Sequence, residues 1–359
     1  VISGPAGSGK TTLALHRVAY LLQNPDTSET YKPESTIVFI QDEQSIGYFS
    51  SLFANLGIED VQFTTFETWV ASLLDLSKEH AYVDRYGDTS VLRDWYEWNK
   101  VAAVRDIAEG LRFLKDPWKC LEQVYGVRGG SFGSLWKEQK RSGIFDKQDL
   151  TALMKILMGE DGGSVMRQKR AFKKKAGSMV PAMSRVVLNY DAVLVDEFEN
   201  YTGDQLSIIR ATLSQKASCL LVGDIRQQTR FGSISDFSQS EFRIPAERNI
   251  VLTKAYRNGR SVLSMLESLG YQVAVDNASD SVGTGEWSTV SESEAEEAAI
   301  AYAESEKDAQ IGIVCFDEDR LLSLKESFAR ISDRIHVGTV MEFQGLEFDS
   351  VFVFGDRKS

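Results

Sequence analysis

The first residues of the chain have the types and spacing of a loop that binds phosphate. The run Gly4-Pro5-Ala6-Gly7-Ser8-Gly9-Lys10-Thr11-Thr12 follows two apolar residues and precedes an apolar pattern with helical spacing. Glycines let the backbone turn its N–H groups inward, and a helix that begins near Lys10 adds the positive end of its dipole. We expect this run to bind a nucleotide, with Lys10 at the β- and γ-phosphates and the Thr11 hydroxyl on Mg²⁺.

Two carboxylates directly follow a later apolar run. Residues 192–195 are predicted to form a buried strand, and Asp196 and Glu197 come next. Ligands of open α/β sheets bind at the carboxyl ends of the strands. We therefore expect Asp196 to bind Mg²⁺ and Glu197 to act as the base that activates the attacking water.

Two further segments carry groups that can sense a terminal phosphate. Residues 218–222 are predicted to form a strand, and the polar loop after it contains Gln227. We expect Gln227 to hydrogen-bond the γ-phosphate or the attacking water. Arg257 precedes a predicted helix over 261–269 and is expected to act as an arginine finger. The alternative is an arginine that only flanks that helix.

The elements that must position these groups alternate between strand and helix. Strands are predicted over 36–40 and 61–65, with helices over about 45–56 and 66–76. This alternation is typical of a doubly wound α/β domain with a parallel sheet. It returns near the end of the chain, with strands predicted over 311–316, 335–340 and 350–354. The sequence thus predicts a second α/β domain of similar kind.

The segment 77–187 has a different pattern. Aromatic-rich amphipathic helices are predicted there without strand-like runs, so we expect a helical insertion in the first α/β domain. Its most basic stretch contains Arg167, Lys169 and Arg170, followed by three lysines at 173–175. Two interpretations of this stretch stay open, namely a solvated helix face and a patch that contacts phosphates.

Composition narrows the class of protein. The 359 residues are 43% hydrophobic and 26% charged, which is ordinary for a globular protein of two or three domains. No apolar run approaches the roughly 18 residues of a membrane helix, and no signal peptide is visible, so we expect a cytoplasmic protein without a membrane partner. Cys120, Cys219 and Cys315 lack metal-site spacing and are expected to be buried thiols. The net charge of −12 leaves nucleic-acid binding to a local groove.

Taken in order, these motifs resemble those of superfamily 1 helicases of the UvrD/Rep type. The matching runs are GPAGSGKTT (4–12), VLVDEFEN (193–200), LVGDIRQQ (221–228), LTKAYRN (252–258) and GTVMEFQGLEFDSVFV (338–353). Two more runs, ALHRVAYLL (14–22) and TTFETWV (64–70), are most similar to the helicase IV branch. The chain departs from the family pattern at Glu199, where glutamine is usual, and at 229–231, where Phe231 is the one aromatic residue. Because the chain begins and ends beside motifs of the family, we expect it to be a fragment.

The resemblance implies a fold and an activity. The fold is α/β, with two RecA-like P-loop NTPase domains that have parallel sheets and bind ATP and Mg²⁺ between them. The first domain is expected over 1–76 and 188–250, the helical insertion over 77–187, and a truncated second domain over 251–359. The implied activity is that of an ATP hydrolase, a DNA helicase or translocase that moves along single-stranded DNA.

The resemblance also implies roles for single residues. It assigns Tyr256 to stacking on the adenine, and it places Gly345 and Glu347 near the ribose and triphosphate. It implies contacts with nucleic acid at Thr65, Phe66, Phe231 and Thr339.

Two other functions stay open. The first is a helicase-like ATPase that remodels a protein partner such as RNA polymerase with little unwinding, for which 77–187 would be the partner-binding arm. The second is a motor subunit of a nuclease or phage-defence complex. Nothing in the sequence resembles a nuclease site, so a nuclease would lie on another chain or segment.

Overall fold

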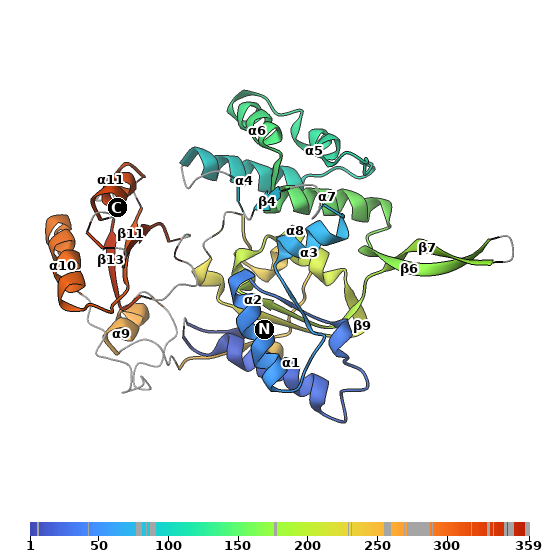
Figure 1. Cartoon of the computed structure of the whole chain (residues 1–359), viewed down its shortest axis with the longest axis horizontal. Coiled ribbons are helices and arrows are strands. Elements are labelled where there is room, and N and C mark those ends of the chain that lie inside the picture. The colour runs from blue at the N-terminus through green and yellow to red at the C-terminus, as the bar shows by residue number, and fades with distance from the viewer. Residues whose placement is uncertain are drawn as a thin grey trace. The chain divides into compact units, whose positions relative to one another are not determined.

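The computed structural model of the chain is shown in Figure 1. It describes residues 1–5, 7–41, 43–76, 81–83, 85–86, 91–175, 178–228, 230, 232–254, 260–268, 270, 288, 290–316, 318–328, 331–332, 334–340, 343 and 348–355. The chain divides into two compact units. Unit 1 comprises Val1–Tyr86 and Trp95–Gly285, and unit 2 comprises Gly87–Asp94 and Glu286–Ser359.

Unit 1 is built on a six-stranded sheet with the strand order β10-β1-β9-β8-β2-β3. All of its strand pairs are parallel. The strands expected near 36–40, 61–65, 192–195 and 218–222 are confirmed as parts of this sheet. Its strands are β1 (Ile2–Ser3), β2 (Thr36–Phe39), β3 (Gln62–Thr64), β8 (Tyr190–Asp196), β9 (Leu213–Gly223) and β10 (Ile250–Val251).

Helices cover both faces of this sheet. On one face, Val38 and Leu194 pack against α1 (Lys10–Gln23) and α2 (Glu43–Asn55). On the other face, Ile37 and Phe39 belong to a core that includes α3 (Phe66–Leu73), α7 (Lys147–Glu160) and α8 (Gly203–Arg210). β2 is buried along its whole length, and burial on both faces explains why Ile37, Val38 and Phe39 are all apolar. The predicted doubly wound α/β architecture is therefore confirmed for this unit, and it is compatible with a RecA-like type.

The helical region shares its core with the sheet. It contains α4 (Val91–Arg105), α5 (Pro117–Tyr125), α6 (Gly130–Ser142) and α7. Trp118 stacks on Phe145 with ring centroids 4.3 Å apart, and Phe145 lies in the same buried cluster as Phe39 of β2. The described helices of the insertion therefore share one hydrophobic core with the sheet.

The expectation that 77–187 lacks strands is wrong. Two short strands, β4 (Ala81–Val83) and β5 (Ile144–Asp146), pair in parallel. The basic stretch forms a long antiparallel hairpin of β6 (Met166–Lys175) and β7 (Ser178–Val187), so it is not a helix face. Arg167, Gln168, Lys169 and Arg170 are all exposed. Because neither face of this part of the hairpin is buried, the sequence has no apolar alternation of period two to reveal it.

Short 3₁₀ helices connect several of these elements. They are η1 (Pro33–Ser35), η2 (Phe198–Asn200), η3 (Ile225–Gln227), η4 (Phe237–Gln239) and η5 (Ala246–Arg248). The α-helix α9 (Arg260–Ser268) follows β10 in unit 1. All three cysteines are free thiols, with Cys120 and Cys315 buried and Cys219 half-buried. Within the described residues, no helix combines the length and the apolar character needed to cross a membrane.

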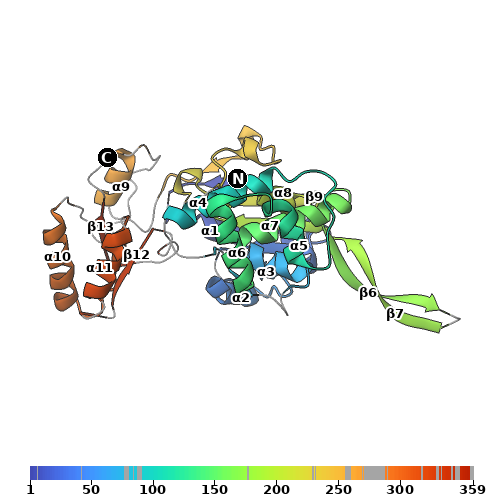
Figure 2. The ribbon, with the colours of Figure 1, turned by 90° about the horizontal axis from the view of Figure 1, so that it is seen from above.

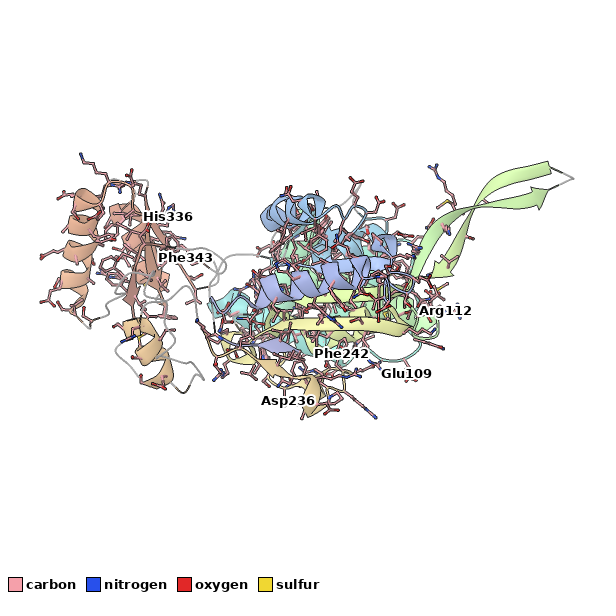
Figure 3. All side chains as sticks on the ribbon, turned by 90° about the horizontal axis from the view of Figure 1, so that it is seen from below. Glu109, Arg112, Asp236, Phe242, His336 and Phe343 are labelled. Atoms are coloured by element: carbon pink, nitrogen blue, oxygen red, sulfur yellow. The ribbon has the colours of Figure 1, made fainter. Side chains whose placement is uncertain are left out.

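Unit 2 contains a smaller parallel sheet with the order β12-β11-β13. Its strands are β11 (Ile311–Cys315), β12 (Ile335–Gly338) and β13 (Ser350–Phe354), and its helices are α10 (Glu292–Ser305) and α11 (Glu318–Phe328). Ile313, Leu324 and Phe328 form part of its core. Phe348 packs on the rings of His336 and Phe343, the two residues of this unit labelled in Figure 3. The predicted strands near the end of the chain are confirmed.

A buried charge cluster ties α4, α6 and α7 together. Lys100 is fully buried, and its Nζ lies 2.6 Å from carboxylate oxygens of both Asp146 and Asp149. Gln139 accepts a further bond from Lys100 at 3.1 Å. Burial, with the charge of Asp146, raises the pKa of Asp149 to about 7. Asp146 also caps α7, so this cluster fixes where that helix begins.

Replacing Lys100 should destabilise unit 1. Lys100→Met leaves two buried carboxylates without their cation, and we expect a loss of about 3–5 kcal/mol in the free energy of unfolding. Urea unfolding followed by tryptophan fluorescence measures this, because Trp69, Trp118 and Trp136 lie in or against the same core. The control is Lys137→Met on the exposed side of α6, which should change stability little. Equal stability of the two variants would contradict a structural role for the cluster.

Candidate nucleotide-binding site

The loop between β1 and α1 has the backbone that its glycines predict. Gly4 has φ +152°, and a Cβ there would lie 2.4 Å from the carbonyl oxygen of Leu252, so only glycine fits. Gly9 caps α1 in the left-handed conformation, with φ 80°. The first N–H groups of a helix have no partner within the helix, so those of Lys10, Thr11 and Thr12 are available to an anion.

The remaining loop residues leave a polar group unused. The Ser8 backbone N–H donates to the carbonyl of Pro5 at 3.3 Å, and Gly7 has φ 73°. The Ser8 hydroxyl is buried and has no hydrogen-bond partner among the described residues. Ala6 lies outside the described residues. An orphaned hydroxyl inside a loop of this shape fits a site that is completed by a polar ligand.

Lys10 folds back over the loop. Its Nζ donates to the carbonyl oxygens of Gly4 at 2.8 Å and Pro5 at 3.0 Å. Burial lowers the pKa of Lys10 below its usual value, against the opposing effect of four carboxylates, those of Glu199, Asp224, Asp196 and Glu197. The ammonium group is therefore surrounded by acidic groups from the ends of β8 and β9.

Thr11 and Asp196 meet directly, although 185 positions separate them in the sequence. The Thr11 hydroxyl lies 3.0 Å from each carboxylate oxygen of Asp196, and it donates to that carboxylate. Burial raises the pKa of Asp196 to about 7, and the charge of Glu197 acts in the same direction. The structure thus brings together the two residues that the sequence assigns to one metal ion.

The chemistry of this pair fits Mg²⁺, which prefers oxygen ligands and keeps several water molecules. Within the described residues, no group of three or more His, Cys, Asp or Glu side chains is arranged to hold a metal. Thr11 and Asp196 would therefore hold the ion together with water and the phosphates of a nucleotide, as such sites commonly do.

Glu197 occupies a strained backbone position. Its φ and ψ are both 47°, which is the left-handed region. Among the described residues, the other non-glycine positions with positive φ are Asp60 and Asp75, and aspartate tolerates this region better than glutamate does. Strain of this kind gathers at functional sites. The side chain accepts a bond from Asn200 at 3.4 Å, directly after the strand that carries Asp196.

Glu199 also belongs to the candidate site. The sequence showed only that it replaces the glutamine usual in the helicase pattern. It is 4% exposed, and its Oε2 has no hydrogen-bond partner among the described residues. This oxygen packs against Gly223 at the end of β9, so closely that a Cβ on Gly223 would lie 1.8 Å from it. Burial raises the pKa of Glu199 to about 8. At neutral pH the group is therefore largely a neutral carboxylic acid, which resembles the amide of a glutamine in shape and charge.

Asp224 connects Glu199 to Gln227. The backbone N–H of Asp224 donates to the Glu199 carboxyl group, and its own Oδ2 accepts from Gln227 Nε2 at 3.2 Å. Asp224 is 4% exposed. Sequence reasoning missed it, although its place directly after the buried end of β9 was a usable signal.

The register of the sheet explains why these loops converge. β9 lies between β1 and β8, with Ser3 opposite Gly223 and Asp196 opposite Val222. The carboxyl ends of all three strands therefore lie at one edge of the sheet. That edge carries Gly4, Glu197 and Asp224 as the next residues along each strand.

Two residues that were expected to contact nucleic acid are engaged inside the protein. The Phe66 side chain is 1% exposed, and its ring packs edge-on against Tyr201 at 6.2 Å. Thr65 is 5% exposed and caps α3 by accepting from the Thr68 N–H at 3.2 Å. Both side chains are thus engaged within unit 1, and their expected contacts with nucleic acid stay predictions.

The other expected residues belong to unit 2 or lie outside the described part of the chain. Thr339 follows β12 in unit 2, is half-buried, and accepts at its carbonyl oxygen from the Phe343 N–H at 3.2 Å. The residues outside the described part of the chain are Phe231, Tyr256, Arg257, Gly345 and Glu347.

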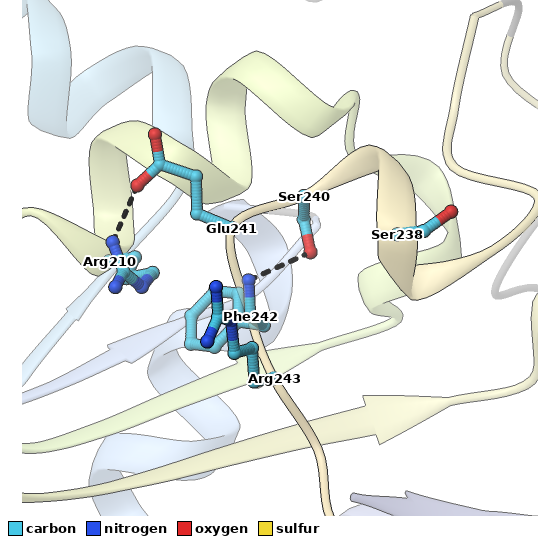
Figure 4. A pocket seen from close by; sticks show the side chains of 6 residues that line it. All are labelled: Arg210, Ser238, Ser240, Glu241, Phe242 and Arg243. Carbon is cyan, nitrogen blue, oxygen red and sulfur yellow. Dashed lines mark hydrogen bonds and ion pairs between the residues drawn. The ribbon is translucent and has the colours of Figure 1, made fainter.

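A surface pocket of ≈ 570 Å³ lies elsewhere on unit 1. Figure 4 shows the ion pair between Arg210 and Glu241 and the bond from the Phe242 N–H to Ser240 Oγ. Arg210 ends α8 just before β9 begins, so the pocket lies toward the amino edge of the sheet and away from Asp196. It includes none of the residues of the loop between β1 and α1. Its lining residues are Arg210, Ser238, Ser240, Glu241, Phe242 and Arg243.

No protein-family model matches this chain, and no curated protein sequence matches it. Its function must therefore be inferred from the side chains at the carboxyl edge of the sheet and from the order of its motifs.

The titration of Glu199 should be visible in the stability of the protein. Its pKa of about 8 exceeds the ordinary value of 4.5, so the folded protein keeps a proton that the unfolded chain has released above about pH 5. The free energy of unfolding should then fall as pH rises from about 5 to about 8, by up to about 1.4 kcal/mol per pH unit for this group.

Glu199→Gln should make that fall shallower, because the amide keeps the neutral form and cannot titrate. Urea unfolding at several pH values measures the slope. Glu109→Gln, at an exposed position labelled in Figure 3, is the control and should leave the slope unchanged. Parallel pH profiles for the parent and Glu199→Gln would contradict the raised pKa.

Proposed function

We propose that this chain is the motor of an ATP-dependent DNA helicase or translocase of superfamily 1. It would bind ATP and Mg²⁺ at the carboxyl edge of the unit 1 sheet and move along single-stranded DNA. The observation that carries the proposal is the pairing of Thr11 with Asp196 at 3.0 Å, beside a strained Glu197. The parallel sheets of both units support the further proposal of two RecA-like domains.

The residues at this edge have complementary tasks in ATP hydrolysis. The α1 N–H groups and Lys10 bind the phosphates, and Lys10 exchanges its bonds to Gly4 and Pro5 for bonds to phosphate oxygens. Mg²⁺, held by Thr11 and Asp196, would neutralise negative charge on the phosphates. Glu197 takes the proton of the attacking water as the water oxygen bonds to the γ-phosphorus and the bond to the β-phosphate oxygen breaks.

Gln227 is placed to sense that reaction. Its amide already donates to Asp224, which also accepts from the backbone N–H of Arg226 at 3.1 Å. The second N–H of this amide could donate to a phosphate oxygen, and its Oε1 could accept a hydrogen bond from water. Because Asp224 also donates its N–H to Glu199, a change at the phosphate is linked by hydrogen bonds to the end of β8.

The negative charge of the site requires that an anionic ligand be accompanied by positive charge. Lys10 lies among four carboxylates, and burial opposes the charged forms of Asp196 and Glu199. A triphosphate adds further negative charge, which Mg²⁺ and an arginine would offset. We propose Arg257 as that arginine and Tyr256 as the adenine contact, on the basis of the motif resemblance.

Removing the proposed base should separate binding from hydrolysis. Glu197→Gln should bind ATP with near-parental affinity and lose roughly 10²-fold or more in hydrolysis rate, because the amide cannot accept the proton of water. Lys10→Ala should weaken ATP binding itself. A phosphate-release assay and binding of a fluorescent ATP analogue measure the two effects. Glu59→Gln, an exposed charge change in the same unit, is the control, and parental hydrolysis in Glu197→Gln would rule out the assignment.

Single-stranded DNA should stimulate the ATPase. A motor that steps along a strand couples closure of its site to that strand, so the hydrolysis rate should rise severalfold with a single-stranded oligonucleotide. The control is Glu197→Gln, which should show no stimulated rate. If the parent hydrolyses ATP but DNA has no effect, the motor assignment fails. The remodelling ATPase that acts on a protein partner such as RNA polymerase would then be favoured.

A further inference from the structure

The β6–β7 hairpin carries a cluster of basic residues on a protein that is acidic as a whole. Residues 166–187 contain seven basic side chains and no acidic one, in a chain whose net charge is −12. Lysines 173–175 continue β6 to its end, where the backbone of Lys175 pairs with Ser178. None of these residues belongs to the proposed ATP site. The hairpin therefore needs its own explanation.

The positive charge lies on both faces of the ribbon. Side chains alternate between the faces of a strand, and directly paired residues share a face. Arg167 and Lys169 therefore lie on one face, whereas Arg170 lies on the other. Arg185 shares the face of Arg170, because it pairs with Gln168. All four of these basic side chains are exposed.

The hairpin extends away from the helices of unit 1. Figures 1 and 2 show β6 and β7 projecting from the body in both views. β6 and β7 form a separate two-stranded sheet. At the base, Arg185 forms an ion pair with Asp161, which caps the C-terminus of α7. One end of the ribbon is thus fastened, while Arg167, Lys169 and Arg170 face solvent.

These dimensions match the major groove of duplex DNA. Strands of ten residues are roughly 33 Å long, about one turn of B-form DNA. The groove is about 12 Å wide and admits a two-stranded β-ribbon. Phosphates line both of its walls, so a ribbon in the groove meets negative charge on both sides. Basic residues on both faces of the ribbon fit such a groove better than they fit a flat anionic surface, because a flat surface can contact only one face.

We propose that the β6–β7 hairpin binds duplex DNA by entering its major groove, as a second nucleic-acid surface beyond the single-strand path of the proposed motor. The contacts are to phosphates, from arginine and lysine on both faces. Binding therefore depends strongly on salt and little on base sequence. The groove of A-form duplex RNA is too narrow and deep for such a ribbon, so the hairpin discriminates against it.

The test uses the full chain without nucleotide and a fluorescein-labelled DNA duplex of about 30 base pairs, roughly three helical turns. The variant R167Q/K169Q/R170Q removes three cations from both faces. We expect it to lose roughly tenfold or more in affinity. The slope of log K against log salt should become shallower by about 2–3, because counterion release scales with the number of neutralised phosphates.

The matched control removes the same charge elsewhere on unit 1. R112Q/K115Q/K119Q changes three exposed basic residues beside α5, of which Arg112 is labelled in Figure 3. It should keep parental duplex affinity and salt slope. Circular dichroism and thermal unfolding of both variants verify that each is folded, which is expected because all six positions are exposed.

Three results would overturn the proposal. The first is unchanged duplex affinity in R167Q/K169Q/R170Q, and the second is an equal loss in both variants. The third is a loss that appears equally with single-stranded DNA, duplex RNA or phosphatidylserine vesicles, since the hairpin would then be a general polyanion contact. Retained affinity for single-stranded DNA with a selective loss for the duplex supports it. Because no ATP is present, the outcome is independent of whether the proposed motor function holds.

Discussion

The parallel pairing of β9 with both β1 and β8 is the constraint on which the candidate site depends. It places Ser3 opposite Gly223 and Asp196 opposite Val222, so three loops leave the sheet at one edge. Thr11 can then reach Asp196 across 185 positions of sequence. A shift of one residue in either pairing would send the strand-end side chains to the opposite face. Backbone hydrogen bonds between the strands thus determine which side chains meet at this edge.

Burial determines the protonation of that edge. Asp196 has its pKa raised to about 7 and Glu199 to about 8, in both cases mainly through burial. Lys10 is held between these acids and the loop carbonyls. Near neutral pH the site therefore carries less negative charge than its four carboxylates suggest. This bears on the proposed nucleotide site, because fully ionised acids would repel phosphates.

The sequence predicted the sheet and its loops because those features are local. Buried parallel strands are apolar runs, and glycines at fixed spacing precede a helix, so β2, β8, β9 and the loop from Gly4 to Lys10 could be predicted. Asp224 and the burial of Glu199 depend on which strands become neighbours, which a single chain does not show. The hairpin was missed because its exposed part lacks an apolar face. The burial of Phe66 could not be predicted because it depends on Tyr201, far along the chain.

The hairpin and the candidate site share one continuous backbone. β7 ends at Val187 and β8 begins at Tyr190, and between them Leu188 is buried and donates its N–H to the carbonyl of Val165. Val165 directly precedes β6, so this bond closes the base of the hairpin. The hairpin is therefore anchored two residues before the strand that ends in Asp196. The anchored base of the ribbon and the strand that leads to the proposed phosphate site are thus two residues apart in the chain.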